Sequence, residues 1–152
     1  MITFEPVAAR PCAGTLVYRA GEYALATEPN PGSFTSLLVN DVHIEVDEDG
    51  CALSVWGLCP HPSWIPHALS PPPARESGLK AKGAAALVPG VGIRLNPRHR
   101  WSVFVDRASG WLCLGDHDAP VVDAYRFAPG AVAVLRDGHL VALWLRPGEL
   151  PR

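Results

Sequence analysis

The sequence lacks the features that most quickly assign a chain to a class. Its formal net charge is only −2 over 152 residues, so no general field attracts nucleic acid or an anionic membrane. No apolar run approaches the ~18–20 residues needed to span a bilayer. The opening residues, Met1 to Pro6, do not combine a basic segment with an apolar stretch, so we expect no secretory signal. These absences predict a cytoplasmic location, with neither nucleic acid nor membrane as a partner.

Catalytic motifs are also missing. The chain has no Gly-x-Ser-x-Gly elbow, no glycine-rich phosphate loop and no His-Glu-x-x-His pair. Whether the protein is an enzyme therefore stays open, and a non-enzymatic role is favoured. Cytoplasmic thiols stay mostly reduced, so we expect free thiols at four positions: Cys12, Cys51, Cys59 and Cys113.

Proline and glycine are abundant, at 16 and 14 residues. Spread among apolar runs, they mark turns between short strands and oppose long helices. We expect little helix; the candidates are residues 78–88 and a single turn over residues 121–125. With 48% apolar residues, the chain is expected to form one domain over residues 1–152.

Three antiparallel hairpins are predicted, over residues 42–56, 101–115 and 131–146. Asp49-Gly50 and Asp137-Gly138 separate apolar runs in two of them, and such pairs tolerate the positive φ that tight turns need. Further short strands are expected at residues 15–19, 23–27, 34–39 and 92–95.

Side-chain alternation orients these strands. Val42, Ile44 and Val46 point one way, which is typical of a strand with one face on the core and one in water. Residues 101–105 and 140–145 are apolar on both faces, so we expect them between two layers or under a covering loop. The pattern predicts an all-β, mainly antiparallel fold, either a β-sandwich or a partly open β-barrel.

The long proline-rich segment 58–76 is the first candidate for a functional site. It holds six prolines, and long irregular segments of compact domains are usually functional or disordered. Trp56 and Trp64 beside these prolines predict a rigid, aromatic, half-exposed binding surface. The alternative is a stiff loop laid over a sheet edge and anchored by Trp64. Residues assigned to binding are Glu45, Asp47, Trp56, His61, Trp64 and His67.

A zinc site is the second hypothesis. Thiolate and imidazole donors are available from Cys51, Cys59, His61 and His67. The spacing argues against it, because Cys51 and Cys59 are too far apart for a Cys-x(2–4)-Cys pair. The alternative is that zinc is absent and Cys51 is buried on its strand; no other cofactor is implied.

The acidic stretch 41–49 is the third candidate. His43, Glu45 and Asp47 alternate along one strand face, at steps of roughly 7 Å. Such a set suits a divalent cation or acid–base chemistry, and the alternative is a solvated strand face.

A thiol nucleophile at Cys113 with His117 as its base is a fourth hypothesis. It is disfavoured because Cys113 shares a strand face with Trp111 and is expected in the core. Four basic residues lie around Asn96-Pro97, and they predict contact with an acidic surface such as the chain's own 41–49 stretch: Arg94, Arg98, His99 and Arg100. An acidic hairpin and a basic loop on one chain also favour self-association, so a homodimer is a candidate.

The sequence favours a non-catalytic protein-binding or accessory domain, immunity-like or part of an assembly, acting through the aromatic, proline-stiffened loop. The alternative is a small-molecule-binding protein or metal-dependent enzyme of β-barrel type. A purely structural domain that forms dimers is the third possibility.

Overall fold

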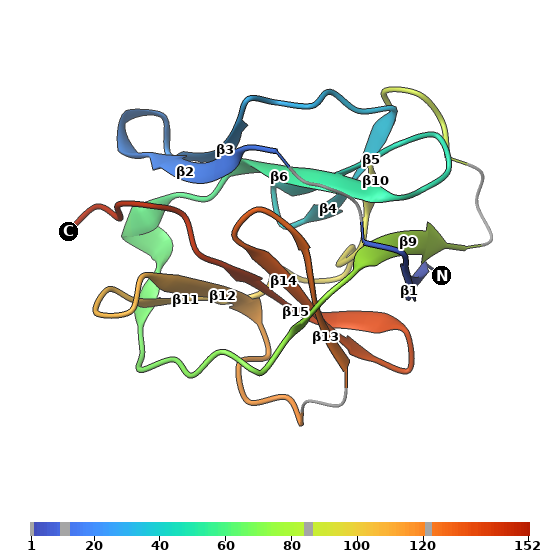
Figure 1. The fold of residues 1–152 in the computed structure, drawn as a ribbon. Coiled ribbons are helices and arrows are strands. Elements are labelled where there is room, and N and C mark those ends of the chain that lie inside the picture. Colours follow the sequence, from blue (N-terminus) through green and yellow to red (C-terminus); the bar gives the residue numbers. More distant parts are fainter. Residues whose placement is uncertain (1, 10–12, 84–86, 121–122) are drawn as a thin grey trace.

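The computed structural model describes residues 2–9, 13–83, 87–120 and 123–152 (Figure 1). Strands dominate the fold, and helix occurs in the described residues only as two 3-10 turns, η1 at Ala20–Glu22 and η2 at His61–Ser63. The predicted all-β, mainly antiparallel class is therefore confirmed. Within the described residues no helix has the length and hydropathy that a membrane span requires.

One layer is a six-stranded sheet. Its spatial order is β10 (Ile93–Arg94), β4 (Thr35–Val39), β5 (Val42–Val46), β6 (Ala52–Leu58), β3 (Ala24–Glu28) and β2 (Thr15–Arg19). All neighbours are antiparallel except β10, which lies parallel to β4.

The second layer is a seven-stranded sheet. Its order is β7 (Ile65–Pro66), β11 (Val103–Asp106), β12 (Trp111–Gly115), β15 (His139–Leu145), β14 (Ala131–Arg136), β13 (Asp123–Ala128) and β8 (Arg75–Glu76). The two-residue strands at its edges, β7 and β8, are parallel to their neighbours. A separate antiparallel ribbon of β1 (Thr3–Val7) and β9 (Gly78–Lys82) contacts β13 and β15.

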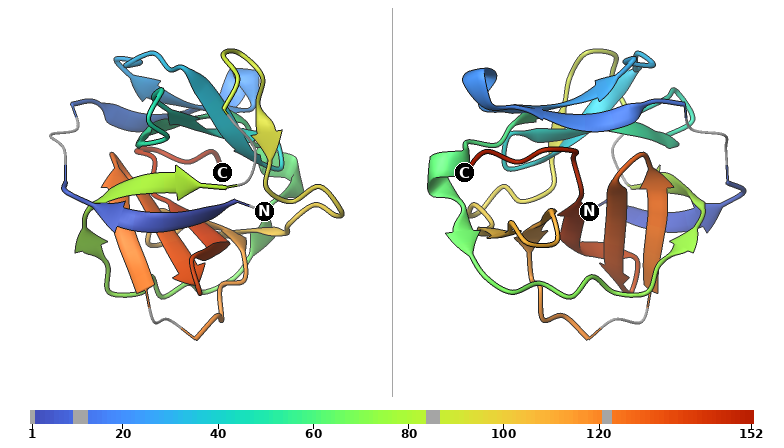
Figure 2. Two further views of the ribbon diagram at one scale, coloured as in Figure 1. Left: turned by 90° about the vertical axis from the view of Figure 1, so that its right-hand side faces the viewer. Right: turned by 60° about the vertical axis from the view of Figure 1, so that its left-hand side comes forward.

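The two large sheets stack face to face, as Figure 2 shows. Leu37 and Ile44 of one sheet and Leu112 and Leu143 of the other belong to the main core, and all four are fully buried. The strand order closes no barrel among the described residues, so of the two predicted architectures the sandwich is the one observed.

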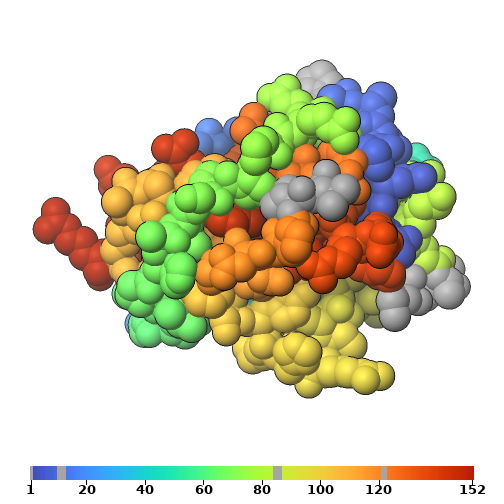
Figure 3. All heavy atoms as spheres, turned by 90° about the horizontal axis from the view of Figure 1, so that it is seen from below, coloured from blue at the N-terminus to red at the C-terminus, as the bar shows by residue number. Residues whose placement is uncertain are grey.

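A second apolar cluster lies on the other face of the seven-stranded sheet. Cys113, Val132 and Trp144 are buried there beneath Leu69, which belongs to the proline-rich segment. β15 therefore has apolar packing on both faces, with Leu143 in the main core, as its sequence predicted. The covering loop is the strap formed by residues 67–74 (Figure 3).

The strap crosses the whole seven-stranded sheet. It begins after β7 at one edge and ends at β8 at the opposite edge. Six strand spacings of ~4.8 Å make the edges roughly 29 Å apart. The nine steps from Pro66 to Arg75 cover roughly 28 Å in the polyproline II conformation, at ~3.1 Å per residue. The run Pro71 to Pro73 thus favours the extended conformation that this crossing needs.

The three predicted hairpins are all present. Asp137 and Gly138 have φ of 51° and 80° at the turn of β14 and β15, as a tight two-residue hairpin requires. Gly50 has φ of 85° between β5 and β6. The corner at Asn40 also has a positive φ, 54°, between β4 and β5.

The helix prediction over residues 78–88 is wrong where the structure describes it. Residues 78–82 form β9, because Leu79 is 1% exposed in the core while the Lys80 backbone pairs with β1 and with Cys51. The turn expected over residues 121–125 is also wrong at residues 123–125, which begin β13; residues 121–122 lie outside the described part.

Candidate functional site

Residues 59–64, between β6 and β7, connect the two sheets, and Tyr18 of β2 holds them in place. Trp64 is only 6% exposed, and its ring centroid lies 4.9 Å from that of Tyr18 on β2. The Tyr18 hydroxyl donates to the carbonyl of Cys59 (2.7 Å) and accepts from the amide of His61 (3.1 Å). The expectation that Trp64 is half-exposed is therefore wrong, because this indole fills the end of the core. It is the anchor that the alternative interpretation required.

Other apolar side chains around this connection face solvent. Of the six exposed large hydrophobic residues in the described chain, three lie in the flanking strands β6 and β7, namely Trp56 (39%), Leu58 (53%) and Ile65 (43%). A fourth, Tyr23 (46%), directly precedes β3, which pairs with β6. We refer to these four residues as the loop surface. Leu58 pairs with Ala24 across the strands, and the Tyr23 ring lies 5.3 Å from that of His61.

The exposed Trp56 side chain packs against His43 of β5. The rings of Trp56 and His43 are stacked, 4.2 Å apart and 12° from parallel, and His43 Nδ1 lies 2.8 Å from the Ser36 hydroxyl. Burial lowers the pKa of His43, so the neutral imidazole is favoured. This packing fixes the Trp56 ring on the outer face of the six-stranded sheet.

The acidic stretch does not form the predicted cluster. Glu45 is 5% exposed and accepts a hydrogen bond from Ser54 (3.1 Å), so the expected solvated face is wrong at that position. Asp47 Oδ1 accepts from the amides of Asp49 and Cys51, both at 2.9 Å, and so stabilises the hairpin turn. Glu45 thus serves strand pairing and Asp47 the turn.

The four proposed zinc ligands are not brought together. Among the described residues no group of three or more metal-ligating side chains is arranged to hold an ion. Cys51 and Cys59 flank the seven-residue strand β6, and eight extended steps of ~3.3 Å separate them by roughly 26 Å. His61 contacts the aromatic rings of the anchored loop, while His67 lies on the strap side. The zinc hypothesis is therefore wrong for this set.

The thiol hypothesis also fails on burial. Cys113 is fully buried in the second apolar cluster, and burial raises the pKa of its thiol to about 12, helped by Asp116 and Asp118. The His117 ring instead packs against His67 (4.3 Å between centroids) and Phe104 (4.5 Å). The expectation that Cys113 packs in the core is confirmed.

Two of the four predicted basic residues meet the acidic stretch: Arg94, at the end of β10, and Arg100. Arg94 and Arg100 reach Asp41, at 3.6 and 3.1 Å, and Arg94 also donates to the carbonyl of Asn40. Arg98 and His99 have no ion pair or hydrogen bond in the described part of the chain.

Comparisons with known proteins give no match: no family model, curated protein or solved structure resembles this chain detectably. Tyr23, Leu58 and Ile65 were missed in the sequence because large apolar residues in short strands usually point into the core. Nothing local marks these three as exceptions.

Proposed function

We propose that the protein is a non-catalytic protein-binding or accessory domain, located in the cytoplasm, that docks a protein partner through the loop surface. The observation that supports this is that four of the six exposed large apolar side chains in the described residues lie on, or next to, the strands around the 59–64 connection. Exposed apolar patches commonly mark interaction sites, and tyrosine and tryptophan are frequent among residues that dominate binding energy.

The backbone under this surface is already ordered. Tyr18 holds Cys59 and His61 by hydrogen bonds, and Trp64 packs into the core beside it. A partner that binds here orders few further groups, so less conformational entropy opposes association. An immunity protein or a fixed component of a larger assembly would use such a surface.

The loop surface is tested by Leu58→Glu, which places a charge in the middle of it. Val91→Glu is the matched control, since Val91 is 56% exposed and lies in the loop before β10. Cross-linking followed by mass spectrometry, with equal amounts of wild type and both variants, measures the partners retained. Thermal melting shows that each variant is folded.

We expect a protein that wild type and Val91→Glu retain and Leu58→Glu loses, with melting temperatures within a few degrees. If folded Leu58→Glu retains every protein that the wild type does, the proposal is wrong. Light scattering on the same samples determines whether the partner is a second copy of the chain.

A further inference from the structure

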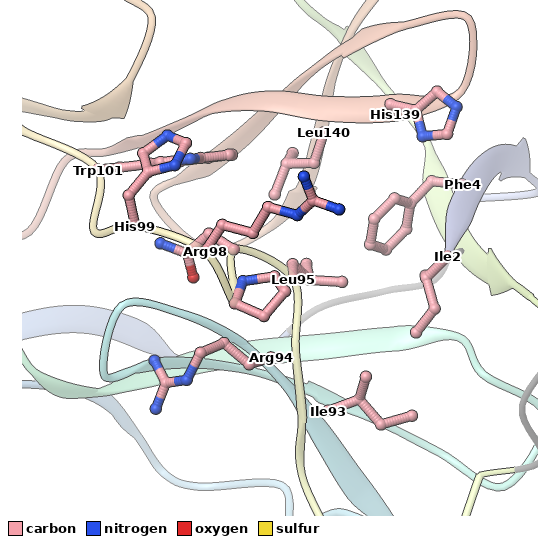
Figure 4. Close-up of a pocket in the computed structure, with 12 residues that line it drawn as sticks. Ile2, Phe4, Ile93, Arg94, Leu95, Arg98, His99, Trp101, His139 and Leu140 are labelled. Carbon is pink, nitrogen blue, oxygen red and sulfur yellow. The ribbon is translucent and has the colours of Figure 1, made fainter.

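A pocket opens between the two sheets at the end of the sandwich where the β14–β15 hairpin meets the loop after β10 (Figure 4). Its volume is about 740 Å³. Ligand pockets in proteins are typically ~300–1,000 Å³, so this one has room for a small organic molecule. We refer to it as the basic pocket, because its lining combines apolar walls with cationic side chains.

The walls are apolar and incompletely covered. They comprise Ile2, Phe4, Ile93, Leu95, Trp101 and Leu140. All except Phe4 are partly buried side chains packed against the main core, and Phe4 belongs to that core. In the described chain, no segment closes over them, so their exposed area is available to an apolar ligand.

Among the described residues, the polar part of the lining consists of one amide, Asn96, and four basic side chains: Arg94, Arg98, His99 and His139. Arg94 is engaged by Asp41 and the Asn40 carbonyl, whereas the side chains of Arg98, His99 and His139 make no ion pair or hydrogen bond within the described residues. No Asp or Glu is among the described residues that line the pocket. The pocket is therefore locally positive, although the net charge of the whole chain is −2.

Arg98 is the side chain best placed to select a ligand. In Figure 4 it extends from its loop toward the centre of the ring of lining residues. A guanidinium matches the two oxygens of a carboxylate, with two parallel hydrogen bonds. One guanidinium with no partner among the described residues suits a single negative charge.

We propose that the basic pocket binds a monocarboxylate with an apolar body, the body against Trp101 and Leu140 and the carboxylate on Arg98. The site goes beyond the proposed function and shares no residue with the loop surface, so either can fail alone.

Three probes separate the two parts of the interaction. Decanoate carries both the apolar body and the charge, decanol only the body, and acetate only the charge. Titration calorimetry measures affinity, and amide and indole shifts in nuclear magnetic resonance spectra locate binding at Trp101 and Leu140.

We expect decanoate to bind at least tenfold more tightly than decanol or acetate. Arg98→Gln weakens decanoate about tenfold or more, because a charge-assisted hydrogen bond is lost. Arg152→Gln removes an arginine outside the pocket and leaves the affinity unchanged. Leu140→Trp fills the pocket and lowers the affinity, whereas Leu58→Glu has no effect.

Equal affinity for decanoate and decanol would overturn the assignment of the carboxylate to Arg98, as would full affinity in Arg98→Gln. Absence of decanoate binding to the folded wild type, or shifts confined to the loop surface, would overturn the site itself.

Discussion

Asn40 and Asn96 hold each other by two hydrogen bonds across 56 residues of sequence. The Asn96 side-chain amide donates to Asn40 Oδ1 (2.8 Å), and the Asn40 backbone amide donates to Asn96 Oδ1 (3.0 Å). Asn40 also exchanges two bonds with the backbone of Trp101, at 2.9 and 3.0 Å. The pair is buried and therefore fixes both ends of the loop that carries Arg98.

Replacing Asn96 by alanine is expected to lower the free energy of unfolding by about 1–3 kcal/mol. The change leaves the buried Asn40 amide without a partner, which costs roughly this much. Urea denaturation measures it. Asn30→Ala is the control, because Asn30 also accepts a backbone amide, that of Gly32 at 2.7 Å, but at an exposed site where effects stay within about 0.5 kcal/mol. Equal stability losses in the two variants would contradict the role of the buried pair.

The sequence was most informative where structure is decided locally. Asp137-Gly138 and Gly50 mark real turns because their left-handed backbone is a requirement of the turn itself. The helix prediction over residues 78–88 failed because β9 is determined by a distant partner, β1. β1 itself was not predicted, and neither was β13, whose pairing with β14 is likewise tertiary.

The candidate sites depend on contacts still further apart in sequence. Trp64 was correctly seen as an anchor in one interpretation, but its burial is decided by Tyr18, 46 positions earlier. Cys51 and Cys59 are close in sequence and yet lie at opposite ends of β6, because a strand extends the chain. The pairing of Arg100 with Asp41 was predictable from charge alone, and it is confirmed.

The buried thiols predict a loss of stability at alkaline pH. Burial raises the pKa of Cys59 to about 11 and that of Cys113 to about 12, from an ordinary value of 9.0. Well below pH 9 both thiols are neutral in the folded and unfolded states, so burial of the neutral thiols contributes its full share of stability. As pH rises above 9, only the unfolded chain ionises readily, and stability falls.

Between pH 8 and pH 10 each of these thiols should lower the free energy of unfolding by about 1 kcal/mol, in urea denaturation at fixed salt. In Cys113→Ala the free energy of unfolding should fall by about 1 kcal/mol less over this pH range, because one of the two buried thiols is gone. The slope with pH is compared, not the absolute stability, so the small cavity in the variant does not affect the result. An unchanged slope would mean that Cys113 ionises as easily in the folded protein as in the unfolded chain.

Shortening the strap is expected to break strand pairing at one edge of the seven-stranded sheet, because the extended length of the strap only just matches the distance between the two edges. Deleting Pro72 shortens the strap by roughly 3 Å. One edge pairing should then break, either β7 with β11 or β8 with β13. The amides that report on the two edges are those of His67, bonded to the Val105 carbonyl (3.0 Å), and Ser77, bonded to the Arg126 carbonyl (3.2 Å).

Hydrogen exchange should be at least tenfold faster at one of these two amides in the Pro72 deletion. Replacing Pro71 to Pro73 by alanines keeps the length, so both amides should stay protected, while greater freedom of the unfolded chain lowers stability by about 1–3 kcal/mol. A freed strand edge can pair with another molecule, so the deletion should also increase aggregation, whereas the alanine variant should not. If the deletion leaves both amides as protected as in the wild type, the strap has slack and its prolines serve only to limit the unfolded chain.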